Sequence, residues 1–448
     1  MKKIGIVFVV LVALIGIYYF TIGSTQIVTE IKKEINQEVT TLKSSGFVVE
    51  ERDIKEKSEH FVIDFNDTKS ITHYLKKSNS TISEEELALL KGLKVGIDIE
   101  YTPTVKDAIS FDIYPLKLPI IFYQELKDDN KTVKAIEKRL KEKLVVVHLN
   151  VDKLLSGFDG YLKDIDTKFN DNDKNGHFIT KGFSFYGDIK DNDIKNLHQN
   201  IKEFSLEVEK EIKLVLSNMK FFIQNPTDAK YSNNSSNYTL ESFTLNQENN
   251  ESSFLTIKNL SGSSKDSKKG EFIDGVAQFK IASIDYSANN QKVLFENLNT
   301  AINIKNVDIN SIQELEKLSE DENVSLKEII PLLKKFTKSD ISFNISNLSL
   351  ESITTNGNKI DGFSINAQAK SNKNFDWNGV ELNPMKLMSL GDIKANISIS
   401  NGLFSLIAQD PKMMMVMMIT QPVDKNGTKV YDLEFNKGSL KVNGKPFM

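Results

Sequence analysis

The stretch FSLEVEKEIKLVL, residues 204–216, carries the clearest structural signal in the chain. Every second position from Phe204 to Leu216 is apolar, with Lys210 as the one exception. Side chains alternate between the two faces of a β-strand, so the pattern predicts a strand with one apolar and one wet face. Strands of this kind are typical of antiparallel sheets that face water on one side.

Similar patterns surround this stretch. Residues 225–237 and 261–271 are rich in Asn, Ser, Gly and Lys, and we expect them to be loops. A helical pair is expected within residues 309–338. Strands are predicted at 238–245, 254–260, 275–286, 293–304, 341–350 and 360–369.

The region before residue 201 is predicted to be more mixed. Residues 24–46 read as an amphipathic helix, because apolar residues recur at three- to four-residue spacing up to Leu42. This helix either packs on its own domain as a stalk or forms a dimerising seam. We expect residues 47–200 to be a mixed α+β region and residues 201–448 to be a β-rich region.

The N-terminus holds a long apolar run, IGIVFVVLVALIGIYYFTI at residues 4–22. As a helix it would span roughly 28 Å, close to the hydrocarbon thickness of a bilayer. Lys2 and Lys3 precede it, and the positive-inside rule then leaves this end in the cytoplasm. The rival interpretation is a cleaved signal peptide, whose apolar core is usually shorter. Residues 1–23 are therefore predicted to be a cytoplasmic tip and transmembrane anchor.

Composition excludes several function classes. The net charge is −4 and only two of the 57 basic residues, Arg52 and Arg139, are arginine, so nothing favours a nucleic-acid partner. The chain has no cysteine, which excludes disulfides, thiol catalysis and thiolate metal sites.

Three patches resemble a known family. They are LFENLNTAINIKNVDINSIQEL at 294–315, ISFNISNLSLESITTNGNKIDGFSINAQA at 341–369 and YDLEFNKGSLKVNGKPF at 431–447. They are similar to the YdgA-like bacterial proteins, an inner-membrane-anchored family grouped as a domain of unknown function. The resemblance implies an envelope location and a β-rich body, and it brings no catalytic residues.

Catalytic and metal motifs are missing from the sequence. The five histidines form no H-E-x-x-H or H-x-H motif, and no P-loop or G-x-S-x-G is present. Asp171, Asp173, Asn175 and Gly176 fit the start of a calcium loop, but Gly182 replaces the glutamate expected at its end, which favours a polar turn. No catalytic, cofactor or metal site is predicted.

A methionine-rich stretch is the most unusual apolar segment. We interpret it either as core or as an adaptable surface for a lipid or protein, since methionine packs against irregular apolar partners. Copper(I) binding is the third reading. The residues proposed for the apolar contact surface are Met413, Met414, Met415, Met417 and Met418.

Five asparagines match an extended N-x-[ST] pattern with an acidic residue two places earlier. Some bacteria glycosylate this pattern, and an acceptor must be exposed. Polar turns also favour these residue types. The predicted glycan acceptors are Asn66, Asn130, Asn250, Asn323 and Asn426.

We therefore expect an α+β fold: an N-terminal transmembrane helix followed by a large, mainly antiparallel β body with a few short helices. The expected location is the bacterial inner membrane, single-pass through residues 4–22, with residues 24–448 periplasmic. The expected function is non-enzymatic, the binding of an apolar ligand (lipid) or a membrane-protein partner. The alternatives are a hydrolase that acts on an envelope polymer through paired carboxylates, and a purely structural glycoprotein scaffold.

Overall fold

The computed structural model contains mainly antiparallel β-structure, with 63% strand and 17% helix. The chain divides into an N-terminal unit that ends at Glu209 and a C-terminal unit that begins at Lys210. The residues that the structure describes are 28–77, 87–125, 130–143, 145–171, 174–190, 193–224, 233–247, 253–288, 291–311, 314, 326–380, 383–410, 414, 420–436 and 438–447.

The N-terminal unit holds ten antiparallel strands, which hydrogen-bond in the order β1-β2-β3-β4-β5-β6-β9-β10-β8-β7. β10 pairs with β9 along its first half and with β8 along its second half. The strands are β1 (Phe47–Ile54), β2 (Ser58–Phe65), β3 (Lys94–Tyr101), β4 (Asp107–Lys117), β5 (Val147–Asp152), β6 (Gly157–Leu162), β7 (Ile165–Asp171), β8 (Lys174–Lys181), β9 (Ser184–Lys190) and β10 (Asp193–Val208).

A helix closes the core of this unit. In α2 (Val28–Ser44) the residues Ile31, Ile35, Val39 and Leu42 are buried, and they join one hydrophobic cluster with apolar residues of β1 to β6 and β9. Their i, i+4, i+8 spacing places them on one helix face, and burial of that face holds α2 against the sheet. The other helices that the described part of this unit contains are α3 (Thr68–Lys77), α5 (Ile120–Glu125) and α6 (Asn130–Lys141).

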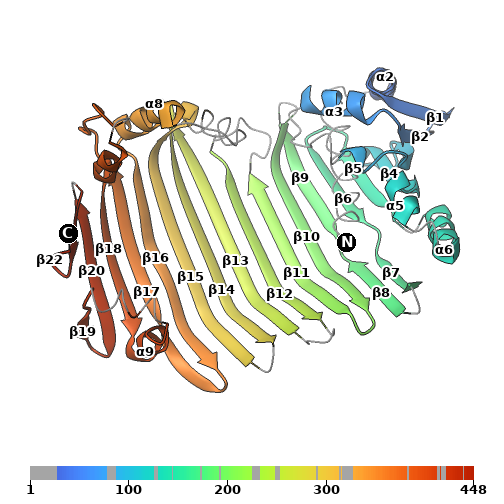
Figure 1. The fold of residues 1–448 in the computed structure, drawn as a ribbon. Coiled ribbons are helices and arrows are strands. Elements are labelled where there is room, and N and C mark those ends of the chain that lie inside the picture. Colours follow the sequence, from blue (N-terminus) through green and yellow to red (C-terminus); the bar gives the residue numbers. More distant parts are fainter. Residues whose placement is uncertain are drawn as a thin grey trace. The chain divides into compact units, whose positions relative to one another are not determined.

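The C-terminal unit is built from much longer strands, which lie side by side in chain order (Figure 1). β18 then pairs with β20, and the short strands β19, β21 and β22 follow at that edge. The strands are β11 (Ile212–Gln224), β12 (Ser235–Gln247), β13 (Ser253–Lys269), β14 (Phe272–Ala288), β15 (Gln291–Asp308), β16 (Ser342–Thr355), β17 (Asn358–Ser371), β18 (Gly391–Ser400), β19 (Val423–Lys425), β20 (Thr428–Asn436), β21 (Ser439–Val442) and β22 (Lys445–Pro446).

Helices cover little of this second sheet. α8 (Leu326–Lys338) lies at one end of the strands and contacts β15. α9 (Asn401–Ile407) contacts β17, β18 and β20. A 3-10 turn, η1 (Pro384–Ser389), precedes β18.

The α+β prediction with a transmembrane helix is wrong. Antiparallel strands dominate both units, and in the C-terminal unit the strands run past their predicted ends, β13 the furthest. No helix in the ranges given above is long and apolar enough to cross a membrane. This finding contradicts the predicted single-pass inner-membrane location, and residues 4–22, on which that prediction depended, lie outside the described residues.

Two local predictions also change. The stretch 204–216 is not one strand but the end of β10, a turn and the start of β11, with Lys210 at a positive φ of 59° in the turn. The stretch 261–271, expected to be a loop, belongs to β13 as far as Lys269. Hydrogen bonding to β12 and β14 on both sides holds this polar segment in the sheet, so tertiary pairing overrides its loop-like composition.

Of the expected helical pair within 309–338, α8 accounts for the second member. In the first member, only residues 309–311 and 314 are described, and they are helical.

Candidate functional site

The C-terminal unit carries an apolar surface built from cross-strand rows. Directly paired residues of an antiparallel sheet share a face, and so do residues two apart along a strand. We call four adjoining rows the apolar face. The rows are Met219, Leu240, Leu260, Ile281, Leu298, Leu350, Phe363 and Ile399; Phe221, Tyr238, Gly262, Phe279, Thr300, Leu348, Ile365, Ile397 and Tyr431; Ala277, Ile302, Ile345, Ala367, Ala395 and Leu433; and Gly275, Ile304, Phe343, Ala369, Ile393 and Phe435.

The opposite side of the same strands is polar. The residues that alternate with the apolar face include amides, lysines and carboxylates, which form rows of their own. Two of these rows are Asn303, Asn344, Gln368, Lys394 and Glu434, and Lys305, Ser342, Lys370 and Asp392. This half of the sheet therefore has one apolar and one wet side.

The apolar pattern changes at one line across the strands. Apolar residues lie three apart there instead of two, as in Leu216 and Met219 or Ile257 and Leu260. Asn218, Asn259 and Asn297 have positive φ angles of 48°, 50° and 54° at this line. Asparagine tolerates this left-handed conformation better than most residues, which explains its repeated use. The sequence signal for the apolar face is this change from two-residue to three-residue spacing within neighbouring strands. Predictions made from one strand at a time did not detect it.

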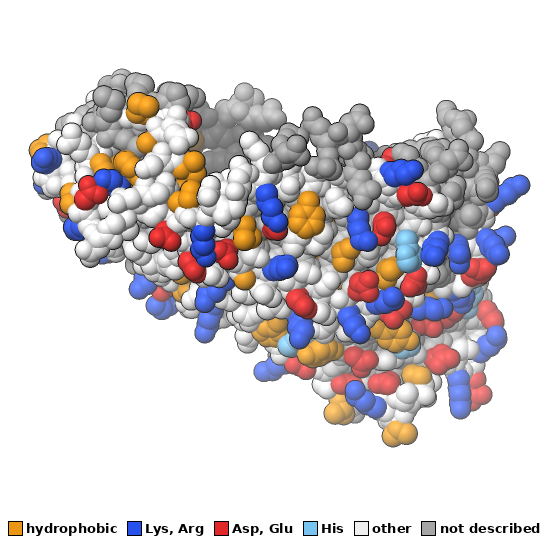
Figure 2. Space-filling model, turned by 90° about the horizontal axis from the view of Figure 1, so that it is seen from below, with side chains coloured by type: hydrophobic (Ala, Val, Ile, Leu, Met, Phe, Trp, Pro, Cys, Tyr) orange, Lys and Arg blue, Asp and Glu red, His pale blue; other side chains and the backbone are white. Residues whose placement is uncertain are grey.

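Most side chains of the apolar face are only partly buried. Ile281, Leu350 and Tyr431 are the buried members, at 6%, 6% and 8% exposure, and the two hydrophobic clusters of the described residues include no residue of this face. One cluster belongs to the N-terminal unit, and the other is a small group around Ile330, Phe375 and Val380. Figure 2 shows hydrophobic side chains at the surface among charged ones.

Three neighbours on the apolar face are well exposed. Ile304, Phe343 and Ile393 are 37%, 36% and 45% exposed, and they belong to one row. Domains normally bury an apolar sheet face against another layer. An exposed apolar patch of this kind is typical of an interaction or ligand site.

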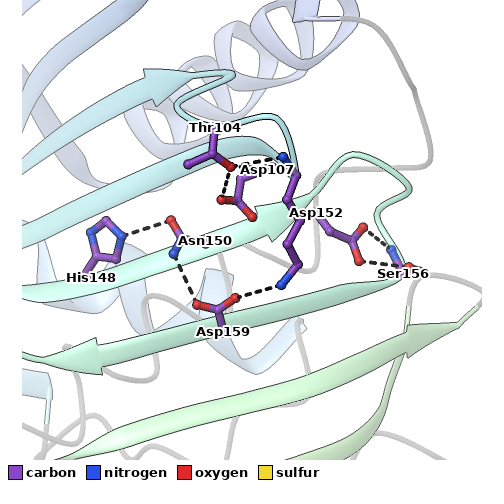
Figure 3. A network of polar contacts seen from close by, with 8 residues as sticks. Thr104, Asp107, His148, Asn150, Asp152, Ser156 and Asp159 are labelled. Atoms are coloured by element: carbon purple, nitrogen blue, oxygen red, sulfur yellow. Dashed lines mark hydrogen bonds and ion pairs between the residues drawn. The ribbon is translucent and has the colours of Figure 1, made fainter.

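A polar network on the N-terminal unit is the second candidate site (Figure 3). Nδ1 of His148 lies 2.7 Å from Asp112 Oδ1, and its Nε2 lies 2.9 Å from Asn150 Oδ1. Asn150 donates to Asp159 at 3.2 Å, and Lys106 lies 3.8 Å from Asp159. The hydrogen bond to Asp112 raises the pKa of His148 against the opposing effect of burial.

This network lacks the geometry of a nucleophilic triad. In such a triad Nε2 of the histidine takes a proton from a serine or cysteine. Nε2 of His148 faces the amide oxygen of Asn150 instead, and the ring stacks on Tyr161. Both ring nitrogens are thus engaged with fixed side chains.

Two carboxylates do face each other on this unit. Asp98 of β3 and Asp112 of β4 are direct register partners, as the hydrolase alternative requires. Burial raises the pKa of Asp98, but hydrogen bonds from Lys143, His60 and Tyr114 outweigh it and hold the pKa below its ordinary value. A general acid needs a raised pKa, so Asp98 is unsuited to that role. The described residues also contain no group of three His, Asp or Glu side chains arranged to hold a metal ion.

The structure describes only some of the predicted site residues. Met414 is 47% exposed, whereas Met413, Met415, Met417 and Met418 lie outside the described residues. Asn66 and Asn426 are exposed, Asn426 in the turn between β19 and β20, and Asn130 begins α6. Asn250 and Asn323 lie outside the described residues, and glycosylation stays a prediction. In the segment suspected as a calcium loop, Asp171 ends β7 and Asn175 and Gly176 belong to β8, whereas Asp173 lies outside the described residues.

The fold and these sites were compared with known proteins. No family model, no curated protein and no solved structure matches this chain. The likeness to YdgA-like proteins therefore stays a prediction.

Proposed function

We propose that this protein binds lipid acyl chains on the apolar face of its C-terminal unit, without catalysis. The observation that carries the proposal is the exposed row of Ile304, Phe343 and Ile393 on a sheet face whose other apolar side chains are mostly only partly buried.

The composition of the face favours acyl chains over a protein partner. Protein interfaces are only a little more than half apolar and contain about one hydrogen bond per 100–200 Å². The four rows of the apolar face consist mainly of aliphatic and aromatic side chains, with a single threonine and two tyrosines as the polar-tipped members. Beyond these rows the register partners are polar, namely Lys429, Ser264 and Asp266. A ligand that needs no hydrogen bonds fits this surface best.

Its size also suits lipid. Neighbouring strands lie about 4.8 Å apart and successive rows about 7 Å apart, so the face covers roughly 35 by 20 Å. Covering one exposed Ile or Phe contributes about 1.5–3 kcal/mol, so several covered side chains are enough for stable binding.

The test uses the full chain purified from its own cells. Organic extraction followed by mass spectrometry should find lipid, and a fluorescent fatty acid should bind the delipidated protein. Changing Ile304, Phe343 and Ile393 together to Gln should weaken binding of the probe at least about ten-fold, since each loses apolar contact.

The matched control is Lys394→Gln, which changes the residue next to Ile393 on the polar side of β18. It should bind the probe like the unchanged protein. Absence of both extracted lipid and probe binding in folded protein would overturn the proposal. So would a concentration-dependent dimer that the triple change dissociates, because a second copy would then be the cover of the apolar face.

A further inference from the structure

The polar side of the C-terminal sheet contains a cavity of about 400 Å³. It lies where β15 ends, β16 begins and β17 ends. Its lining includes Asn303, Lys305, Ser342, Asn344, Gln368 and Lys370. This cavity is on the side opposite the apolar face, because its residues alternate with Ile304, Phe343 and Ala369 along the three strands.

Two lysines are placed symmetrically in this cavity. Lys305 of β15 pairs in register with Ser342 of β16, and Ser342 pairs with Lys370 of β17. The two lysines therefore stand on one face with one strand between them, about 10 Å apart at the backbone. Both side chains are exposed, and Ser342 lies between the two lysines in the register.

These two lysines lack an ion-pair partner in the part of the chain that the structure describes. Within the described residues, neither Lys305 nor Lys370 has a carboxylate oxygen within 4.0 Å. The acidic neighbours have other partners. Asp340, which also lines the cavity, pairs with Lys373 at 3.0 Å, and Asp274, which interacts electrostatically with Lys305, pairs with Lys269 at 2.6 Å.

One further carboxylate is near. Asp392 lies opposite Lys370 in the register of β17 and β18, without forming an ion pair at 4.0 Å. The contrast is Lys394, the residue two positions along β18, which pairs with Glu434 at 3.3 Å. The cavity thus keeps a positive charge while the adjoining row is neutralised.

Hydrogen-bond donors complete the cavity. The amides of Asn303, Asn344 and Gln368 line it next to the two ammonium groups. Charged donors together with neutral donors are the set that a multi-oxygen anion requires. The C-terminal unit contains no arginine, so lysine is its available cation for such a ligand.

We propose that this cavity binds the phosphate group of a ligand between Lys305 and Lys370. A tetrahedral oxyanion can accept from both ammonium groups and from the hydroxyl and amides at once, whereas a carboxylate offers fewer oxygens. The phosphate can belong to a soluble phosphate compound or to a phospholipid headgroup. The inference is independent of acyl-chain binding, since it concerns the other side of the sheet.

The test measures binding of inorganic phosphate to the full chain by calorimetry, at low salt. Lys305→Gln and Lys370→Gln should each weaken binding about ten-fold or more, because each removes one charged hydrogen bond. The matched control is Lys280→Gln, which changes an exposed lysine of β14 outside the cavity. It should leave the affinity for phosphate unchanged. Lys305→Arg and Lys370→Arg should retain binding.

A second arm separates the two sources of phosphate. Vesicles of phosphatidylglycerol and of phosphatidylcholine are compared in flotation with each variant. Preference for the anionic vesicles that is lost in Lys305→Gln and Lys370→Gln supports a headgroup ligand, and phosphate binding without vesicle binding supports a soluble one. Failure of the unchanged protein to bind either probe, or equal binding by the Gln variants, overturns the proposal. Fatty-acid binding should be unchanged in these variants. A failure of the phosphate proposal can therefore be distinguished from a failure of the acyl-chain proposal.

Discussion

The ring of Tyr238 fills the space above Gly262. A Cβ atom on Gly262 would lie 2.1 Å from Cζ of Tyr238, and the two residues are direct register partners on β12 and β13. The aromatic ring of Tyr238 thus covers β13 at Gly262, where that strand has no side chain. Gly262 belongs to the stretch 261–271, whose composition resembles a loop.

Replacing Gly262 with Ala should destabilise the C-terminal unit by about 1–3 kcal/mol, because the ring must move away from the added methyl group. Urea unfolding measures the change. The cost should shrink when Tyr238→Ser is combined with it, since the clash is then gone. Ser263→Ala, one position along on the other side, is the control, and an equal cost there would refute this explanation.

The left-handed asparagines give a second prediction. Asn259 sits inside β13 with φ at 50°, where a β-branched side chain is strained. Asn259→Val should cost about 1–2 kcal/mol, while Asn259→Gly should be tolerated because glycine adopts this conformation freely. Unfolding midpoints in urea compare the two.

The control for Asn259 is Asn237→Val in β12, at an exposed strand position with ordinary φ. Valine favours strands, so this change should be neutral or stabilising. If both valine variants lose the same stability, the conformation at Asn259 is not the cause.

Sequence reasoning found the antiparallel character of the chain but not the extent of its strands. Alternation around Phe204 and Leu216 is a local signal, and it was correct about which side chains share a face within each strand. It could not show the turn at Lys210, because a charged residue in the apolar register fits a strand as well as a turn.

The candidate sites were hidden for a related reason. The apolar face and the phosphate cavity arise from register between strands, and register depends on tertiary pairing. Lys305 and Lys370 are far apart in the sequence. They lie on the same face, one strand apart, only because Ser342 pairs with both. The methionine stretch was conspicuous in composition, but Met414 is its single described member and lies exposed.

His148 provides a prediction on pH. Its hydrogen bond to Asp112 raises its pKa above the ordinary value near 6.5. A raised folded-state pKa contributes stability that is fully present below pH 6.5 and is lost as the pH rises through the folded-state pKa. Asp112→Asn should lower the pKa of His148 in an NMR titration and remove this part of the pH dependence of unfolding.

Asp188→Asn is the matched control for Asp112, because Asp188 bonds to Asn196 and not to a histidine. It should leave the titration of His148 unchanged. A pKa of His148 that does not move in Asp112→Asn would show that another group sets it.

The last prediction decides between the two interpretations of the amphipathic helix. In α2, Ile35 is 0% exposed and belongs to the core cluster of its own unit. Ile35→Ala should therefore destabilise that unit by about 2–5 kcal/mol, through lost burial and the cavity left behind. Lys33→Ala, on the exposed side of the same helix, should change stability by less than about 0.5 kcal/mol. A dimerising seam predicts the opposite: Ile35→Ala would then change the association state in analytical ultracentrifugation and leave the unfolding of the monomer nearly unaltered.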